Sequence, residues 1–393
     1  MKVLYIVSAY QRHEGDVITP WLVETIRRLK NKEVQVSVLA PSYKGLRSHT
    51  VDGVQVERFR YFFRKWENLT HEETAPDRVG RSWFYKILIP FYVVSGMYKA
   101  MRICREQRFD VIHVHWPVPH ALLGWVGKKF SGSRLVLTFY GVELRWVKNK
   151  LPFLRRFISW AIKRADLVTS ISSHTQQEIR NYSHKPATII PFGAGFDVGP
   201  VGESAEAQPP EILFVGRLVE RKGVKYLVDA FLQLSREMNV KLYIVGEGPE
   251  KQALDEQIQR LRIQDKAILT GSIPESELRL RYRKCSVFVL PAIVDSKGDT
   301  EGLGVVLIEA LLYGKPVIAS CIGGIVDIVK DGKTGILVPE KDSRQLAQAL
   351  KNLLTDPLLR RRLAEDGRQF VQQHFSWDRI IAQLKSAYAG ITN

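Results

Sequence analysis

The sequence predicts an α/β protein of two domains, each built on an open, mostly parallel sheet covered by helices. The chain has 393 residues, and hydrophobic cores of that size usually divide between domains. Hydrophobic residues make up 45% of it, which is enough for packed cores. Short apolar runs alternate with longer amphipathic stretches in both halves of the chain. That alternation is typical of parallel strands joined by crossover helices.

The strand-like runs are short, apolar and rich in β-branched residues. In the first half they cover residues 3–7, 34–39, 54–59, 111–115, 135–139 and 167–171. In the second half they cover residues 212–215, 241–245, 267–269, 287–290, 317–319 and 336–338.

The amino-acid composition of one stretch indicates where the two domains meet. Residues 199–210 are rich in Gly, Pro, Ala and Glu without apolar periodicity, and we interpret them as a linker between domains at 1–198 and 211–375. The final segment, 376–393, carries a helix expected from Trp377 to Ala389 that can cross back to the first domain. Open parallel sheets bind ligands beyond the carboxyl ends of their strands, so we expect the two domains to face a central cleft that holds the site.

The cysteines and the apolar segments favour a cytoplasmic protein. Cys104, Cys285 and Cys321 are far apart, with neither metal-site spacing nor a disulfide framework. The N-terminus runs directly into a strand-like segment and lacks the pattern of a signal peptide. The most apolar candidate for a membrane helix, Ile87 to Met97, is shorter than the roughly 18 residues that a span requires.

The net charge of +17 is concentrated in the first half. Residues 1–200 hold 31 Lys and Arg against 16 Asp and Glu, and residues 201–393 hold 27 against 25. A basic first domain suits an anionic membrane surface or a phosphate-bearing acceptor. Nucleic acid is disfavoured because the chain has no recognisable binding motif and its second half is nearly neutral.

The segment EGLGVVLIE, residues 301–309, is the most informative part of the chain. Glu301 precedes a turn in which Gly302 and Gly304 allow the backbone to approach a ligand closely. An apolar helix is expected from Val305, and a helix N-terminus is a ready anion site. Glu309, inside that helix, needs a partner in an apolar setting. The segment predicts a site for a ligand that is both phosphorylated and rich in hydroxyls.

The two glutamates do not have the spacing of a glycosidase pair. Eight helical residues span about 12 Å, whereas the carboxylates of glycoside hydrolases lie roughly 5 to 9.5 Å apart. We therefore expect Glu301 and Glu309 to hold different parts of one long ligand. The simpler alternative is a solvated loop acid and a helix residue bonded locally.

Three further segments follow predicted strands of the second domain. Gly216 and Arg217 follow the first strand and Lys222 opens the next helix, so two cations could grip a diphosphate. An exposed basic loop is the alternative. Gly246 lies in a glycine turn that resembles half of a dinucleotide fingerprint. Ser272 stands where a base could lie, or where an ordinary helix begins.

In the first domain, Gly15 follows the first strand and suits close backbone approach beside a helix N-terminus. Asp16 is a candidate N-cap. Strand alternation puts His113 and His115 on one face, where they could bind a metal. No third ligand lies nearby in the sequence, so core or cleft histidines are the favoured interpretation and no metal site is expected.

As a set, these motifs match a known family in order and spacing over nearly the whole second half. The second half resembles the retaining glycosyltransferases of family 4, which have the two-domain GT-B fold. The matching segments are Gly216-Arg217…Lys222-Gly223, Val245 to Glu250, Gly271-Ser272, Glu301-x7-Glu309, Gly314-x-Pro316-Val317 and Gly323-Gly324. The first half matches more loosely, through the Gly15 loop, Asp110 to His115, and Leu137 to Gly141.

The resemblance implies a role for each residue. Arg217 and Lys222 would hold the donor diphosphate and stabilise the leaving nucleotide. Glu309 would bind the ribose and Glu301 the transferred sugar. Backbone N–H groups of Gly302, Leu303 and Gly304 would bind phosphate or sugar, and Gly15 would close over the diphosphate from the other domain. Gly216, Gly246 and Ser272 would complete the donor site. Transfer would proceed without a bound metal or cofactor, with retention of configuration, and with the donor phosphate helping to deprotonate the acceptor.

One position departs from the family pattern. Many members have a histidine where this chain has Tyr140, and tyrosine is a poor base near neutral pH. Tyr140 and His115 are candidate contacts for the sugar or the acceptor. The resemblance implies a UDP-, GDP- or ADP-linked hexose as donor and a lipid-linked or surface-polysaccharide precursor as acceptor. Aromatic residues from Trp83 to Tyr92 favour peripheral docking on a membrane. The alternatives are a nucleotide-sugar epimerase, a phosphorylase, or a catalytically silent sugar-nucleotide binder.

Overall fold

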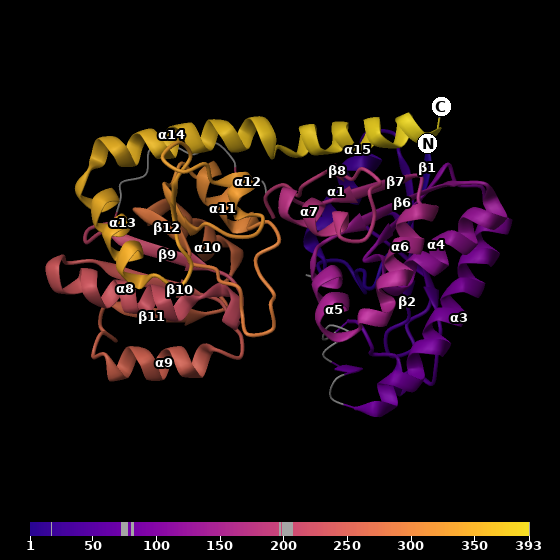
Figure 1. The fold of residues 1–393 in the computed structure, drawn as a ribbon, viewed down its shortest axis with the longest axis horizontal. Coiled ribbons are helices and arrows are strands. Elements are labelled where there is room, and N and C mark those ends of the chain that lie inside the picture. Colours follow the sequence, from indigo (N-terminus) through magenta and orange to yellow (C-terminus); the bar gives the residue numbers. More distant parts are fainter. Residues whose placement is uncertain (17, 72–77, 80–81, 196–197, 199–206, 393) are drawn as a thin grey trace. The chain divides into compact units, whose positions relative to one another are not determined.

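The chain folds into two compact units in the computed structural model. The first contains Met1–Ile171, Thr175–Ile190 and Ile380–Asn393, and the second contains Ser172–His174 and Pro191–Arg379. The structure describes residues 1–393 except 17, 72–77, 80–81, 196–197, 199–206 and 393 (Figure 1). Most of the predicted linker therefore lies outside the described residues.

The first unit is built on an eight-stranded sheet with the order β3-β4-β2-β1-β5-β6-β7-β8. Its strands are β1 (Lys2–Ile6), β2 (Gln35–Pro41), β3 (His49–Val51), β4 (Val54–Phe59), β5 (Val111–His115), β6 (Arg134–Phe139), β7 (Leu167–Ser170) and β8 (Thr188–Ile189). Its helices are α1 (Pro20–Lys30), η1 (Arg64–Trp66), α3 (Trp83–Glu106), α4 (Pro117–Ser131), α5 (Val142–Lys150), η2 (Pro152–Leu154), α6 (Arg155–Arg164), α7 (Ser173–Arg180), whose first two residues belong to the second unit, and the greater part of α15 (Trp377–Thr392).

The second unit is built on a six-stranded sheet with the order β11-β10-β9-β12-β13-β14. Its strands are β9 (Glu211–Val215), β10 (Lys241–Val245), β11 (Ala267–Gly271), β12 (Val287–Leu290), β13 (Val317–Ser320) and β14 (Ile336–Val338). Its helices are η3 (Glu220–Lys222), α8 (Val224–Glu237), α9 (Lys251–Arg260), α10 (Glu275–Lys284), α11 (Val305–Leu312), α12 (Ile325–Ile328), α13 (Ser343–Thr355) and α14 (Pro357–His374).

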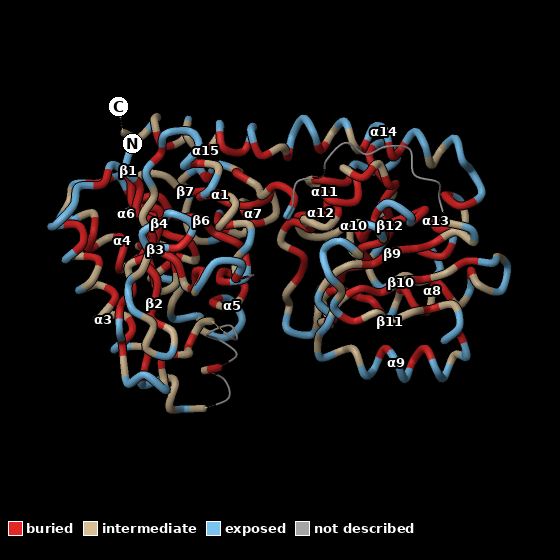
Figure 2. The backbone as a smooth tube through the Cα atoms, turned by 180° about the vertical axis from the view of Figure 1, so that it is seen from behind, coloured by how far each residue is buried: buried red, intermediate tan, exposed pale blue. Residues whose placement is uncertain are grey.

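The predicted fold class is confirmed. Every strand run predicted from the sequence coincides with an observed strand, and every pairing between named strands is parallel except that of β3 with β4. The central strands β1, β5, β9 and β12 are buried apart from the exposed Lys2 of β1 and the half-buried Val215 of β9, as their apolar runs require (Figure 2). Strands β3 and β8, which have three and two residues, were not predicted because such short segments carry no periodic signal.

The last helix, α15, contributes its C-terminal part to the first unit. Tyr388 of α15 is fully buried, and its hydroxyl lies 2.6 Å from Nδ1 of His113 and 2.9 Å from the hydroxyl of Tyr5. The ammonium group of Lys385 donates to the carbonyl of Lys32. These contacts tie the C-terminus to β1 and β5 of the first sheet.

Helix α3 is longer than the apolar run predicted from the sequence. Among the described residues, it is the one helix whose length and composition would be sufficient to cross a membrane. The predicted run Ile87 to Met97 was too short because Trp83 to Lys86 and the residues after Met97 also belong to the helix. One face of α3, with Leu88, Tyr92 and Gly96, is buried beside α4.

Candidate active site

Loops at the carboxyl edge of the second sheet are stacked backbone to backbone. Gly216, after β9, donates its N–H to the carbonyl of Val245 at 3.0 Å. Gly246, after β10, has φ of 143°, and a Cβ there would lie 1.9 Å from the carbonyl oxygen of Gly216. Only glycine fits at position 246 because any side chain would collide with rigid backbone. The glycine turn thus has a packing reason in addition to its predicted role in the donor site.

Glu301 lies in a buried ion-pair cluster with two cations. Its Oε2 is 2.5 Å from Nζ of Lys222 and 3.1 Å from a guanidinium nitrogen of Arg221. Lys222 is itself 8% exposed and lies in η3, so it precedes α8 and does not open it as the sequence predicted. Arg221, which the sequence analysis did not select, also approaches Asp299 at 3.6 Å. The structure thus joins two predicted site residues directly.

The electrostatics of Glu301 follow from this cluster. Burial alone would raise the pKa of its carboxyl group, but the charges of Lys222 and Arg221 outweigh burial and lower the pKa to about 2. Glu301 is therefore ionised throughout the physiological range. A buried carboxylate held between two cations is a fixed hydrogen-bond acceptor.

Arg217 differs from Lys222 because its side chain is exposed. No ion pair or side-chain hydrogen bond of Arg217 is found with any residue that the structure describes. The guanidinium group is available to an anion from solvent.

The segment that follows Glu301 leads into α11. Leu303 is buried, and Gly304 adopts φ of 91° as the residue that precedes the helix. Gly324 packs against this turn and donates its N–H to the carbonyl of Glu301 at 3.0 Å. Because the helix begins only at Val305, the helical spacing used in the sequence analysis does not apply to residues 301–304.

Glu309 is buried on α11, and both of its oxygens have protein donors. Oε1 accepts the N–H of Gly195 at 3.0 Å, and Oε2 accepts the hydroxyl of Tyr282 at 2.8 Å. Burial raises the pKa of Glu309 in spite of these two bonds. The predicted partner of this carboxylate is thus found within the protein, and each oxygen retains a lone pair for a ligand.

Ser272 does not cap a helix. Helix α10 begins at Glu275 after Pro274, and Ser272 is an exposed residue three positions earlier. The cap-like sequence was misleading because Pro274, with extended backbone, takes the N-cap position.

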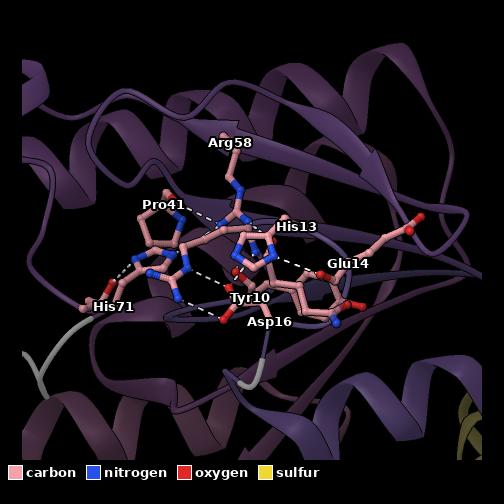
Figure 3. A network of polar contacts seen from close by, with 10 residues as sticks. Tyr10, His13, Glu14, Asp16, Pro41, Arg58 and His71 are labelled. Atoms are coloured by element: carbon pink, nitrogen blue, oxygen red, sulfur yellow. Dashed lines mark hydrogen bonds and ion pairs between the residues drawn. The ribbon is translucent and has the colours of Figure 1, made fainter.

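In the first unit, the loop after β1 that contains Gly15 is held by charges (Figure 3). Gly15 is exposed with φ of 76°. Asp16 is not an N-cap, because α1 begins at Pro20, and its carboxylate instead pairs with Arg12 at 2.6 Å. The hydrogen bonds from Arg12 outweigh burial and lower the pKa of Asp16 to about 2.

Arg58 of β4 holds the start of the same loop through its guanidinium group. Its buried guanidinium donates to the carbonyls of Tyr10 at 3.0 Å, Gln11 at 2.5 Å and Pro41 at 3.2 Å (Figure 3). Burial lowers the pKa of Arg58 to about 10. Arg58 was not predicted as a functional residue because an isolated arginine in a strand belongs to no motif.

His115 and Tyr140 are brought together at the ends of the adjacent strands β5 and β6. Nδ1 of His115 lies 2.6 Å from the hydroxyl of Tyr140, and Nε2 of His115 is buried with no hydrogen-bond partner among the residues that the structure describes. Burial lowers the pKa of His115 well below its ordinary value and raises that of Tyr140 well above 10. Both side chains are therefore neutral near pH 7.

His113 precedes His115 by two residues on β5, and both of its ring nitrogens make hydrogen bonds. Nδ1 lies 2.6 Å from the hydroxyl of Tyr388, and Nε2 lies 2.6 Å from that of Thr138. His113 is thus a core histidine, as favoured from the sequence. Among the described residues no group of three or more His, Cys, Asp or Glu side chains is arranged to hold a metal.

Glu143 is a second buried acid that the sequence analysis did not select. It lies in the first turn of α5 and accepts the N–H of Tyr140 on Oε1 at 2.8 Å. Its Oε2 is buried and has no hydrogen-bond partner in the described part of the chain, and burial raises the pKa of Glu143 to about 7. Its position three residues after Tyr140, at a helix start, was the available signal.

Comparison with known proteins identifies the family. A family model described as "Glycosyl transferases group 1" matches residues 202–370, and one described as "Glycosyltransferase Family 4" matches residues 21–195. An uncharacterized glycosyltransferase of Methanocaldococcus jannaschii is 30% identical over an alignment of 318 residues that covers 76% of this chain and 79% of that protein. The chain belongs to the group 1, family 4 glycosyltransferases.

This glycosyltransferase is also similar to better-defined relatives. A GDP-mannose-dependent alpha-(1-6)-phosphatidylinositol monomannoside mannosyltransferase of Mycolicibacterium smegmatis is 28% identical over 86% of the chain and 91% of that protein. Sucrose-phosphate synthase of Thermosynechococcus elongatus has a TM-score of 0.75 at 22% identity, over 100% of the chain and 99% of that structure. Anabaena HepE in complex with UDP and glucose has a TM-score of 0.72 at 19% identity, over 99% and 100%. The fold is GT-B.

Proposed function

We propose that this glycosyltransferase moves a hexose-type sugar from a nucleotide diphosphate to a lipid-linked or surface-polysaccharide precursor. Retention of configuration and independence from metal are part of the proposal. The names of two similar proteins support the substrate classes. One is GDP-mannose-dependent and acts on a phosphatidylinositol mannoside, and one structural neighbour is in complex with UDP and glucose.

The observation that carries the proposal is the cluster of Glu301, Lys222 and Arg221, together with the exposed Arg217 in the loop that leads from β9 to these two cations. Glu301 neutralises Lys222 in their ion pair. A diphosphate held by Arg217 would supply Lys222 with a second anion, and Glu301 would turn a lone pair toward a sugar hydroxyl. The same cations would stabilise the charge that develops on the leaving nucleotide.

For the remaining residues of the donor site we propose the roles that the family motifs imply. Glu309 would bind the ribose, and the N–H groups of Gly302, Leu303 and Gly304 would bind phosphate or sugar. Gly216 and Gly246 would bring backbone close to the nucleotide, Ser272 would lie near the base, and Gly15 would contribute its N–H to the diphosphate.

The chemistry requires a proton acceptor for the attacking hydroxyl. In the proposed step the bond between the anomeric carbon and the donor phosphate oxygen breaks. The acceptor oxygen then bonds to the same face of that carbon. The depressed pKa of His115 and the elevated pKa of Tyr140 make both poor proton acceptors at neutral pH. We therefore assign the proton to the leaving phosphate, with His115 and Tyr140 as sugar or acceptor contacts.

A thermal-shift screen with UDP-, GDP- and ADP-sugars tests the donor site. A ligand that binds only the folded protein raises its melting temperature by mass action. We expect one nucleotide class to raise it and Arg217→Glu to abolish the rise. Arg236→Glu, an exposed reversal in the last turn of α8, is the matched control. A full shift in Arg217→Glu would overturn the diphosphate assignment.

Product analysis separates transfer from the alternatives. An epimerase would convert the donor without an acceptor, and a silent binder would show a thermal shift without turnover. Membership in the glycosyltransferase family favours transfer. Glu301→Ala should therefore abolish sugar transfer while a donor-induced shift persists.

An aromatic groove in the first unit supports a lipid-linked acceptor. It has a volume of about 950 Å³, and its lining includes Phe62, Phe63, Trp66 and Phe84 together with the cations Lys44, Arg64 and Lys65. The groove follows β4, at the carboxyl edge of the sheet where the Gly15 loop and His115 also lie. Aromatic walls with cationic residues suit an apolar chain joined to a phosphate.

Helix α3 extends this apolar surface. Trp83, Ile87, Phe91, Val94 and Tyr98 share one helical face and are between 43% and 71% exposed. We propose that this face rests on an anionic membrane, which would make the protein cytoplasmic and peripheral. Phe91→Glu should reduce retention on vesicles of phosphatidylglycerol at low salt. Lys225→Glu, in the other unit, is the control, and equal retention of all three proteins would refute the docking face.

A further inference from the structure

A second, strongly basic pocket lies in the first unit, away from every residue assigned above. It has a volume of about 820 Å³. Its lining includes one acid, Asp166, one aromatic residue, Trp125, and six cations, which are Lys128, Lys129, Arg134, Lys163, Arg164 and Lys185. The ends of α4 and α6, the start of β6, and the last turn of α15 form its walls.

The pocket occupies the amino edge of the sheet. Arg134 is the first residue of β6, and Asp166 immediately precedes β7. His115 and Tyr140 lie at the opposite, carboxyl edge. A strand of β6 length spans roughly 20 Å at 3.3 Å per residue, so a ligand in this pocket would not touch the proposed sugar contacts.

Part of the positive charge has a structural explanation. Lys128 pairs with Asp166 at 2.6 Å and also donates to the carbonyl of Arg164. Arg134 approaches the same carboxylate at 3.8 Å, and Lys185 donates to the carbonyl of Ala165. These residues neutralise Asp166 and satisfy the last carbonyls of α6, as basic residues at helix C-termini commonly do.

The other three cations, Lys129, Lys163 and Arg164, do not pair with Asp166 or donate to the last carbonyls of α6 within the described part of the chain. Lys129 lies 5.8 Å from the centre of the Trp125 ring. Lys163 and Arg164 are exposed, and neither side chain makes an ion pair or hydrogen bond with a residue in the described part of the chain. Cations gathered around one hollow repel one another unless an anion enters it.

We infer that this pocket binds a multiply charged phosphate-bearing anion at a site separate from the donor site. Lys163 and Arg164 would contact the phosphate oxygens, with Lys129 above the Trp125 wall as a further contact. The anion could be a soluble phosphate compound or the headgroup of a phospholipid, and the two sources share this chemistry.

Isothermal titration with inorganic tripolyphosphate tests the site in the full-length protein. Arg217→Glu serves as the background, because it removes the proposed diphosphate grip of the other unit. On that background, Lys163→Glu/Arg164→Glu should weaken binding by about tenfold or more for each of the two reversed cations. The matched control is Lys150→Glu/Arg156→Glu, which reverses two exposed charges of the same unit outside the pocket.

A second arm distinguishes the sources. Vesicles of phosphatidylcholine with and without phosphatidic acid are compared for retention of the wild type and the two double variants. If Lys163→Glu/Arg164→Glu loses both tripolyphosphate binding and the retention that depends on phosphatidic acid, the pocket is a headgroup site. If it loses only tripolyphosphate binding, the ligand is a soluble phosphate compound. Equal tripolyphosphate affinity in the pocket and control variants would overturn the inference, whatever the outcome of the donor screen.

Discussion

Removal of the Lys222 ammonium group should leave the buried negative charge of Glu301 with only one cation, Arg221, to balance it. The Glu301 pKa of about 2, in place of 4.5, corresponds to roughly 3 kcal/mol of native-state stabilisation at neutral pH. Breaking a buried ion pair costs about 3 to 5 kcal/mol. In Lys222→Met, Arg221 remains 3.1 Å from the carboxylate and retains part of this stabilisation. We expect the free energy of unfolding to fall by about 2 to 3 kcal/mol at pH 7.

The pH dependence has a definite sign. Because the folded pKa of Glu301 is depressed, its stabilisation is present above about pH 4.5 and is lost as the pH falls toward about 2. In Lys222→Met the folded pKa should rise, so the difference in stability between wild type and variant should shrink as the pH is lowered through that window.

Urea unfolding, followed by tryptophan fluorescence and by circular dichroism, measures the effect. A double-mutant cycle with Glu301→Gln isolates the pair, and the coupling energy should be about 2 kcal/mol at pH 7. Lys225→Met, an exposed lysine on α8, is the control and should change stability by less than about 0.5 kcal/mol. A coupling energy near zero, or a wild-type unfolding midpoint in Lys222→Met, would refute the reasoning.

Three further predictions concern buried polar groups. Because burial raises the pKa of Glu143 to about 7, wild type should lose roughly 3 kcal/mol from this residue as the pH rises from about 4.5 through 7. Glu143→Gln should not show that loss. The prediction is contradicted if the free energies of unfolding of wild type and Glu143→Gln, measured in urea, change in parallel with pH. Tyr282→Phe deletes the donor to Glu309 and should cost about 1 to 3 kcal/mol, but much less in a Glu309→Gln background. Arg58→Met removes the hydrogen-bond donors of three carbonyls and should lower the free energy of unfolding by about 3 kcal/mol. A urea-unfolding midpoint equal to that of wild type would contradict the role of Arg58 in holding the Gly15 loop.

The sequence by itself determined the fold class, the family and every strand except β3 and β8. Strand runs and glycine turns are local patterns, because side-chain alternation and backbone freedom depend on near neighbours. The segment from Glu301 to Glu309 was recognisable for the same reason. Helix starts were less certain, and Asp16 and Ser272 were misplaced because capping depends on where the chain turns.

Only the tertiary structure decided which charges meet. Lys222 and Glu301 are 79 positions apart in the sequence, and Gly195 and Glu309 are 114 apart. The contact between Lys222 and Glu301 arises because parallel strands place distant loops at one sheet edge. Gly195 lies in the segment before β9 and reaches Glu309 on helix α11. Burial, which sets the pKa of Glu143, likewise depends on packing by other elements, and no local pattern encodes it. The basic pocket was visible in the sequence only as an excess of positive charge, until the ends of α4 and α6 brought six cations around one hollow.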